Sequence, residues 1–169
     1  MSAFERLWTG WRSSYVQSVG ATDPGTGDGS VFTRILRSGL SDDEANIVYR
    51  GATCFAILNA YPYGTGHTLV LPYHEVADLE ALEPTEAAEL WATVTDAVQA
   101  VKRAYDPDGV NVGINLGRPA GGSVSEHLHV HVVPRWTGDA NFMTAIANTR
   151  TLPEPLDQTA AKLRAAWPA

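Results

Sequence analysis

The segment 126–136 reads Glu126-His127-Leu128-His129-Val130-His131-Val132-Val133-Pro134-Arg135-Trp136, with a histidine at every second position from 127 to 131. Leucine and valine fill the alternate positions, and this period of two is typical of a β-strand with one apolar face. Such a strand would place three imidazole rings on one face and the aliphatic side chains on the other. We therefore expect the aliphatic face to pack in a core and the imidazole face to carry the chemistry.

The length of the chain limits the body around this strand to one domain. Its 169 residues, 44% of them hydrophobic, suffice for one core and are too few for two comfortable ones. The segment 18–30 is rich in Gly, Thr, Asp and Pro, which is typical of a flexible connector. We expect an N-terminal amphipathic segment and connector at 1–30, the main domain at 31–145, and a C-terminal tail with a helix at 146–169.

Composition argues against several classes of protein. No stretch approaches the roughly 20 apolar residues of a membrane span, which predicts a soluble, cytoplasmic protein without membrane contact. A net charge of −7, from 12 basic and 19 acidic residues, argues against general affinity for nucleic acid. The single cysteine, Cys54, excludes an internal disulfide and a thiolate-rich zinc site, and we expect it to be buried as a small hydrophobic residue.

Five strands and one long helix are predicted from the patterning. Apolar residues at helical spacing predict a helix over 85–105, with Pro84 where a first turn tolerates proline. Strands are predicted at 47–50, 53–59, 67–72 and 110–115, with the histidine segment as the fifth. A short helix or turn at 31–40 and a last helix at 155–167 complete the set. Because short turns join the strands, we expect an α+β domain, an antiparallel meander with the long helix on its face.

Two chemistries are compatible with the histidine row. At about 3.3 Å per residue, adjacent histidines of a strand lie roughly 6.6 Å apart and the outer two roughly 13 Å. Two of them are close enough to share a metal ion, but the third would then have no role. The candidates for a further ligand to such an ion are His67, His74, Glu126 and Cys54.

Nucleophilic catalysis gives all three positions a role. One imidazole attacks an electrophilic phosphorus, a second protonates the leaving group, and a third orients the nucleophile. The glycine-rich loop at 117–123 lies just upstream, and its Gly121-Gly122-Ser123 allows the backbone to approach a phosphate closely. We therefore favour nucleophilic catalysis over a metal centre.

The motif His127-Leu-His-Val-His-Val-Val133 resembles the signature of the histidine triad (HIT) superfamily, whose nucleotide-binding domains are α+β. Further motifs follow in the order of the superfamily: Phe55-Ala-Ile-Leu-Asn59, Tyr61-Pro62 and Gly66-His67-Thr-Leu-Val-Leu-Pro72. The resemblance covers roughly residues 30–142. It implies a HIT-like fold with about five antiparallel strands, one long helix and short terminal helices.

Within the superfamily, the chain is most similar to actinobacterial diadenosine tetraphosphate phosphorylases. The similarity rests on the 117–123 loop, the spacing before the first histidine and the 134–143 segment. Common hydrolases of the superfamily carry Gln-Ser/Thr-Val where this chain has Gly122-Ser123-Val124. Many relatives carry Cys-x-x-Cys where this chain has Ser30-Val-Phe-Thr33, so we expect neither their structural zinc nor any other bound metal here.

The resemblance implies a role for each of four histidines. His129 matches the nucleophile, which attacks the α-phosphorus and forms an adenylyl-imidazole while ATP departs. One of its nitrogens is expected to be tied to a backbone carbonyl so that the other is free. His131 matches the leaving-group side, where it supplies a proton, and His127 and His67 match positions that orient the nucleophile.

The remaining candidates bind substrate. Phe32, Ile35 and Ile57 match apolar positions that hold adenine, and Asn59 matches the ribose-binding position. Candidates that match phosphate contacts, or that follow from the phosphorylase-like pattern, are Asn115, Gly122, Ser123, Glu126 and Trp136.

The reaction implied is phosphorolysis of diadenosine tetraphosphate by inorganic phosphate, which gives ATP and ADP. The alternative within enzymes is a hydrolase of dinucleoside polyphosphates or nucleoside phosphoramidates, with water as the acceptor. A non-catalytic nucleotide-binding module would not need to retain His129. No cofactor is required, although Mg²⁺ on the polyphosphate is compatible with the reaction. The expected partners are adenine nucleotides, phosphate and further copies of the chain, as a homodimer or homotetramer.

Overall fold

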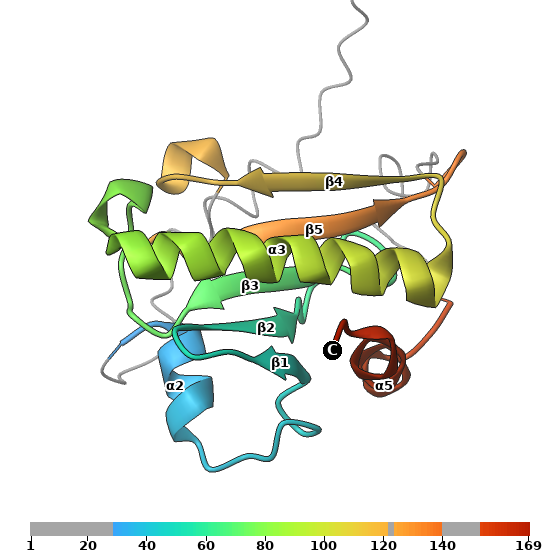
Figure 1. Cartoon of the computed structure of the whole chain (residues 1–169), viewed down its shortest axis with the longest axis horizontal. Coiled ribbons are helices and arrows are strands. Elements are labelled where there is room, and N and C mark those ends of the chain that lie inside the picture. The colour runs from blue at the N-terminus through green and yellow to red at the C-terminus, as the bar shows by residue number, and fades with distance from the viewer. Residues whose placement is uncertain (1–28, 122–123, 140–152) are drawn as a thin grey trace, which may run out of the picture.

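The computed structural model describes residues 29–121, 124–139 and 153–169. Within them the chain forms a five-stranded sheet with a long helix, which confirms the predicted α+β fold (Figure 1). The helices are α2 (Val31–Arg37), α3 (Pro84–Tyr105) and α5 (Leu156–Ala166), with 3-10 turns η1 (Leu79–Ala81) and η2 (Arg118–Ala120). The strands are β1 (Ile47–Arg50), β2 (Cys54–Leu58), β3 (Thr68–Pro72), β4 (Gly109–Ile114) and β5 (Val130–Arg135). The predicted N-terminal amphipathic segment lies outside the described residues.

Every strand pairs antiparallel with its neighbours, in the order β1-β2-β3-β5-β4. The predicted meander is therefore wrong at one connection, because β5 lies between β3 and β4. The side chains explain this order. Val130 and Val132 of β5 are fully buried, whereas Asn111, Val112 and Gly113 of β4 are exposed. The more apolar strand takes the interior position, and the strand with less to bury takes the edge.

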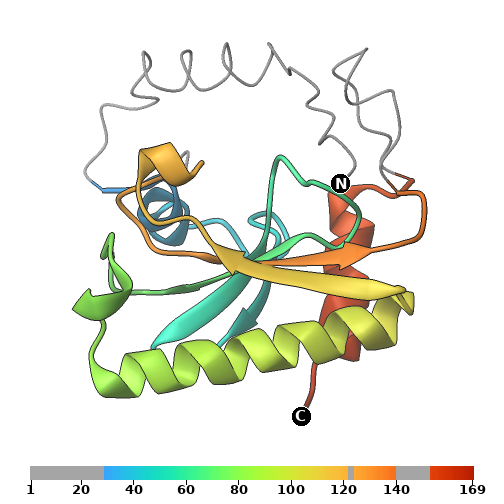
Figure 2. The ribbon, with the colours of Figure 1, turned by 90° about the horizontal axis from the view of Figure 1, so that it is seen from above.

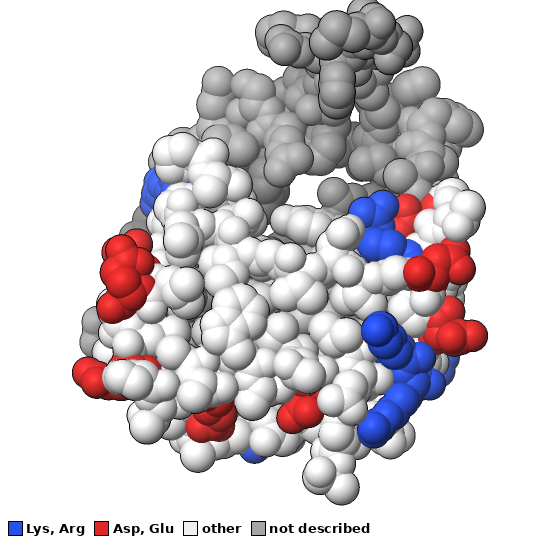
Figure 3. All heavy atoms as spheres, turned by 45° about the horizontal axis from the view of Figure 1, so that its top comes forward, with Lys and Arg blue, Asp and Glu red and all other residues white. Residues whose placement is uncertain are grey.

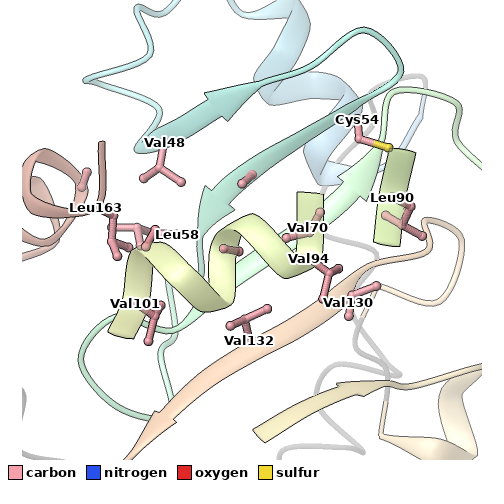
Figure 4. Close-up of a cluster of buried hydrophobic side chains, with 14 of the residues drawn as sticks. Val48, Cys54, Leu58, Val70, Leu90, Val94, Val101, Val130, Val132 and Leu163 are labelled. Atoms are coloured by element: carbon pink, nitrogen blue, oxygen red, sulfur yellow. The ribbon is translucent and has the colours of Figure 1, made fainter. Parts of the chain in front are cut away.

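The long helix α3 begins at Pro84, one residue before its predicted start. Glu83 and Glu86 form a capping box at its N-terminus, and Asp106 ends it in the left-handed conformation (φ 45°). Its apolar stripe covers one face of the sheet. The core between them includes Leu90, Val94, Val101, Val130 and Val132 (Figure 4).

The opposite face of the sheet carries α2 (Figure 2). Along β2, Ala56 and Leu58 point into the core under α3. Phe55 and Ile57 point the other way and pack with Phe32 of α2. Figure 2 also shows the 59–67 loop and η2 rising on the α2 side. The long helix α3 covers only one face of the sheet, so polar side chains are able to lie on the opposite face, beside α2.

The predicted C-terminal helix is present as α5, which packs against α3 and β1. Leu163 is fully buried, and the Arg164 guanidinium donates hydrogen bonds to the carbonyl oxygens of Ile47 (2.8 and 3.0 Å) and Asp42 (2.9 Å). These contacts tie the end of the chain to the first strand. Cys54 is buried, as expected. Among the described residues, no helix is long and apolar enough to cross a membrane.

Candidate active site

The histidine row is only partly a strand. β5 begins at Val130, so His131 lies within it, while His127 and His129 lie on the segment that leads from the bend at 124–127 into the strand. The predicted alternation still holds, because Val130 faces the core under α3 and the imidazoles face the α2 side. The ring centroids of His129 and His131 lie 4.9 Å apart. The rings are therefore close enough to act on one substrate.

His129 has one ring nitrogen occupied by the backbone. Its Nδ1 lies 2.8 Å from the carbonyl oxygen of His127. A carbonyl only accepts, so Nδ1 carries the proton and Nε2 presents a lone pair. The residue is 6% exposed, which leaves a narrow approach to the ring. The sequence predicted this arrangement, with one nitrogen tied to a backbone carbonyl and the other free.

His127 is fully buried, with both ring nitrogens engaged. Its Nε2 lies 2.8 Å from the carbonyl oxygen of Pro72 and therefore carries the proton. Its Nδ1 accepts from the Ser30 hydroxyl at 2.7 Å. These two bonds hold the His127 ring in place. They also hold the backbone carbonyl of His127 where it accepts the Nδ1–H of His129. The orienting role predicted for His127 stays a prediction, for which this geometry is suited.

His67 contacts His131, whereas the predicted role was to orient His129. Its Nδ1 accepts from the backbone N–H of Tyr63 at 3.0 Å and faces the Asn59 amide nitrogen at 3.3 Å. The proton therefore resides on Nε2, which donates to Nδ1 of His131 at 3.0 Å. His131 in turn carries its proton on Nε2, which lies 3.4 Å from Nδ2 of Asn115, so a hydrogen bond between the two requires the Asn115 amide to be turned with its oxygen toward the ring. His67 thus sets the tautomer of His131, whereas the backbone carbonyl sets that of His129.

Burial lowers the pKa of all three histidines of the row. Desolvation is the largest cause in each case, and it brings the pKa of His131 to about 4, with a smaller contribution from His129. Hydrogen bonds to carbonyls and the charge of Glu126 act in the opposite direction on His127 and His129, but they do not offset burial. The three rings are therefore neutral at pH 7, the form in which an imidazole is a nucleophile.

The three predicted adenine-binding residues lie together beside the histidines. The Phe32 ring lies 5.6 Å from the His127 ring and 5.5 Å from the His129 ring, between centroids. Ile57 and Ile35 belong to the same apolar cluster, Ile57 as a buried member and Ile35 at its partly exposed border. An apolar surface thus adjoins the nucleophile, as a purine would require.

The other predicted residues are more dispersed. Glu126 is exposed next to the row, and its charge raises the pKa of His127 and His129. Trp136 packs edge-on against Tyr105 (centroids 6.5 Å apart), at the end of α3. Gly122 and Ser123 lie outside the described residues. The roles predicted for these residues stay predictions.

Sequence reasoning assigned no role in the site to three residues that contact the histidines or their partners. Ser30 binds His127, Glu75 accepts from Ser30 and Thr33, and the Tyr63 ring stacks on His131 at 5.8 Å with 14° between the planes. Ser30 has a sequence signal, since it is the N-cap of α2. Glu75 has none, because its partners lie more than 40 residues away.

The described residues do not fit a metal centre. They contain no group of three or more His, Cys, Asp or Glu side chains placed to hold an ion. Ser30 and Thr33 stand where the resemblance implies a cysteine pair in other family members, but zinc sites use thiolate, imidazole and carboxylate ligands. Both hydroxyls are also engaged in hydrogen bonds to His127 and Glu75.

Comparisons with known proteins agree with this geometry. The HIT domain model matches residues 41–138. The AP-4-A phosphorylase of Mycobacterium tuberculosis is 45% identical over 96% of this chain and 84% of its own length. An asymmetrical bis(5'-nucleosyl)-tetraphosphatase of Schizosaccharomyces pombe is 34% identical over 56% of this chain and 52% of its own. Among solved structures, a zinc-bound histidine triad family protein of Mycobacterium smegmatis superposes with a TM-score of 0.66, at 32% identity over 81% of this chain and 91% of the other. The chain therefore belongs to the HIT domain family.

Proposed function

We propose that the protein is a nucleotidyltransferase that cleaves diadenosine tetraphosphate with inorganic phosphate, giving ATP and ADP. The observation that carries the proposal is the lone pair of His129 Nε2, fixed by the bond from Nδ1 to the His127 carbonyl. The Nε2–H of His131 lies on the adjacent ring. The similarity to an AP-4-A phosphorylase supports the choice of substrate and acceptor.

The first step forms a bond from His129 Nε2 to the α-phosphorus and breaks the bond from that phosphorus to the bridging oxygen. The electron pair of the broken bond leaves with ATP, and the Nε2–H of His131 hydrogen-bonds or protonates the departing oxygen. The adenylylated ring keeps its Nδ1–H on the His127 carbonyl. In the second step a phosphate oxygen attacks the same phosphorus, the P–N bond breaks, and ADP leaves with His129 restored.

Substrate recognition follows the shape of the site. Phe32, Ile35 and Ile57 supply the apolar surface for adenine beside the nucleophile. Asn59 lies next to His67 and would meet the ribose, while Asn115 lies next to His131 on the leaving-group side. We assign phosphate and acceptor contacts to Gly122, Ser123, Glu126 and Trp136 on the strength of the phosphorylase-like sequence pattern. Mg²⁺, where present, would accompany the polyphosphate as part of the substrate.

Identification of the nucleotides formed tests this proposal. The protein is incubated with diadenosine tetraphosphate, with and without phosphate, and the products are separated. We expect ADP and ATP in equal amounts only when phosphate is present. Formation of AMP and ATP regardless of phosphate would overturn phosphorolysis in favour of the hydrolytic alternative.

We also propose that two copies pair through β4 in the cytoplasm, where the nucleotide substrates are found. β4 is an edge strand, and Val112 on it is 44% exposed. Figure 3 shows few charged side chains in the middle of the face over β4 and α3. An open, weakly charged edge favours pairing with an identical edge across a two-fold axis.

A further inference from the structure

A polar cluster lies behind the histidine row, made of the buried residues Ser30, Thr33 and His127 and the half-buried Glu75. Its members come from the start of α2, the segment after β3 and the segment before β5. Both carboxylate oxygens of Glu75 lie 2.9 Å from the backbone nitrogen of Ser30, and the Thr33 hydroxyl donates to one of them. The Ser30 hydroxyl reaches His127 Nδ1 at 2.7 Å. The cluster thus joins three separate segments at one point.

Each proton in this cluster has a defined direction. Burial tends to raise the pKa of Glu75, but the hydrogen bonds from Thr33 and Ser30 lower it overall, so the carboxylate only accepts. Thr33 must therefore point its hydroxyl proton at Glu75. The Ser30 hydroxyl lies 3.3 Å from Thr33 Oγ1 and 2.7 Å from His127 Nδ1. Because the Nε2–H of His127 is committed to the Pro72 carbonyl, Nδ1 only accepts, and Ser30 points its proton at His127. Glu75 thus fixes the Thr33 hydroxyl and the Ser30 backbone, while the Pro72 carbonyl fixes the tautomer of His127.

The same cluster sets two features of the nucleophile. The carbonyl of His127 accepts the Nδ1–H of His129, so a shift of residue 127 would weaken the bond that exposes Nε2. Phe32 lies between the two α2 members of the cluster and packs against the rings of His127 and His129. The first turn of α2, anchored by Glu75, therefore holds His129 through two contacts. One is the hydrogen bond to the His127 carbonyl, and the other is the packing of the Phe32 ring.

We propose that Glu75 is a positioning residue, which holds the tautomer and the placement of His129 through Ser30, Thr33 and His127. The positioning role rests on the proposed function in one respect only, because the proposed adenylylation reaction is used to measure its effect. Misplacement of a reacting group by about 1 Å is enough to slow a reaction on the order of 100-fold, so the effect is measurable.

The chain offers a matched control. Glu89 accepts from the backbone N–H groups of Ala52 (2.7 Å) and Thr53 (3.0 Å) and from the Thr53 hydroxyl (2.6 Å). The carboxylate of Glu89 thus has the same kinds of donor as that of Glu75, but it ties α3 to the β1–β2 turn instead of to the histidines. Glu89→Gln reports what the loss of such a network does to folding alone.

The experiment compares Glu75→Gln with Glu89→Gln in single-turnover adenylylation by diadenosine tetraphosphate and in ¹⁵N NMR of the histidine tautomers. We expect Glu75→Gln to slow adenylylation about 10-fold or more and to lower the population of the His129 Nδ1–H tautomer. Glu89→Gln should keep the rate within about two-fold of the parent and leave the tautomers unchanged. Equal rates and unchanged tautomers in the two variants would overturn the proposal.

A second pair of variants covers the case in which Glu75→Gln fails to fold. Thr33→Val removes the hydroxyl that binds Glu75, and Thr33→Ser retains it. We expect slow adenylylation in the valine variant and recovery in the serine variant; no difference between them contradicts the positioning role. If the parent protein does not react with diadenosine tetraphosphate, the proposed function fails, and the NMR comparison alone decides the role of Glu75.

Discussion

A nucleophilic imidazole must present a lone pair to phosphorus, and this protein achieves that by occupying the other nitrogen. His129 Nδ1 is committed to a carbonyl at 2.8 Å, and His131 Nδ1 to the Nε2–H of His67 at 3.0 Å. The two rings consequently present opposite functions on the same face, a lone pair on one and a proton donor on the other. His129 and His131 have the same side chain, so their different roles, as nucleophile and as proton donor, come from their different tautomers.

At the residue scale, His129→Ala should abolish the adenylylated protein. The side chain that forms the P–N bond is absent, and no other described ring nitrogen on this face has a fixed free lone pair. Acid-labile label from diadenosine tetraphosphate measures the intermediate. A covalent adenylyl group that persists in this variant would show that another residue is the nucleophile.

His67→Leu should slow the first step without abolishing it. Removal of the donor to His131 Nδ1 frees that ring to turn its lone pair toward the leaving group, so assistance to the departing oxygen is lost. We expect a rate about 10- to 100-fold lower with diadenosine tetraphosphate. The loss should shrink with a 4-nitrophenyl ester of AMP, whose leaving group needs less assistance.

The control for His67→Leu is His74→Leu. His74 is an exposed histidine that pairs with Glu86 at 3.4 Å, away from the row. The control variant should react at the parent rate with both substrates. An equal loss with both leaving groups in His67→Leu would argue against a role for His131 as proton donor.

Sequence reasoning identified the residues of the row but not the bonds among them. The motif at 127–131 predicted the nucleophile and its tied nitrogen, and the bond to the His127 carbonyl agrees. The partner of His67 was misjudged, because the spacing of residues 67 and 131 in sequence does not reveal that their strands pair. Glu75 was missed for the same reason, since its contacts to α2 depend on tertiary packing.

At the scale of elements, the pattern of apolar residues predicted each helix and strand to within a few residues. The order of the strands was not predictable from short turns alone. β4 follows β3 in sequence but pairs with β5, because α3 carries the chain across the sheet and β5 has more apolar surface to bury. The insertion of β5 beside β3 is also what brings His131 next to His67.

Leu163→Ala in α5 should destabilise the fold and spare the chemistry. The side chain is fully buried between α5, α3 and β1, so the truncation leaves a cavity and lowers the free energy of unfolding by about 2–5 kcal/mol. Urea denaturation measures this loss. Single-turnover adenylylation, measured where the variant is folded, should match that of the parent. A large rate loss in the folded variant would mean that α5 supports the histidines directly.

At the scale of the whole molecule, the buried imidazoles couple stability to pH. Their folded-state pKa values are lowered from 6.5, to about 4 for His131, so the unfolded chain binds more protons than the folded one between these values. Stability therefore decreases as pH falls from 6.5 toward 4. Carboxylates with lowered pKa, such as Glu75 and Glu89, add a further loss below 4.5.

The urea midpoint should accordingly fall between pH 7 and pH 5. His131→Gln removes one of the buried titrating groups and should reduce the size of this fall. A midpoint that is unchanged between pH 7 and pH 5 in the parent would mean that the rings titrate normally and are charged in the folded protein at pH 5.

The molecular mass of the protein in solution tests whether two copies pair through β4. Val112→Lys places a charge on the open edge, and we expect it to shift the protein from dimer or tetramer toward monomer in light scattering. A parent protein that is monomeric at all accessible concentrations would contradict pairing.

The central claim is that His129 carries an adenylyl group which inorganic phosphate removes. The most direct measurement is to label the protein with diadenosine tetraphosphate in the absence of phosphate, locate the adduct by mass spectrometry of its peptides, and then add phosphate. The account predicts an adduct on His129 that is released as ADP. An adduct elsewhere, or its release as AMP in the presence of phosphate, would contradict it.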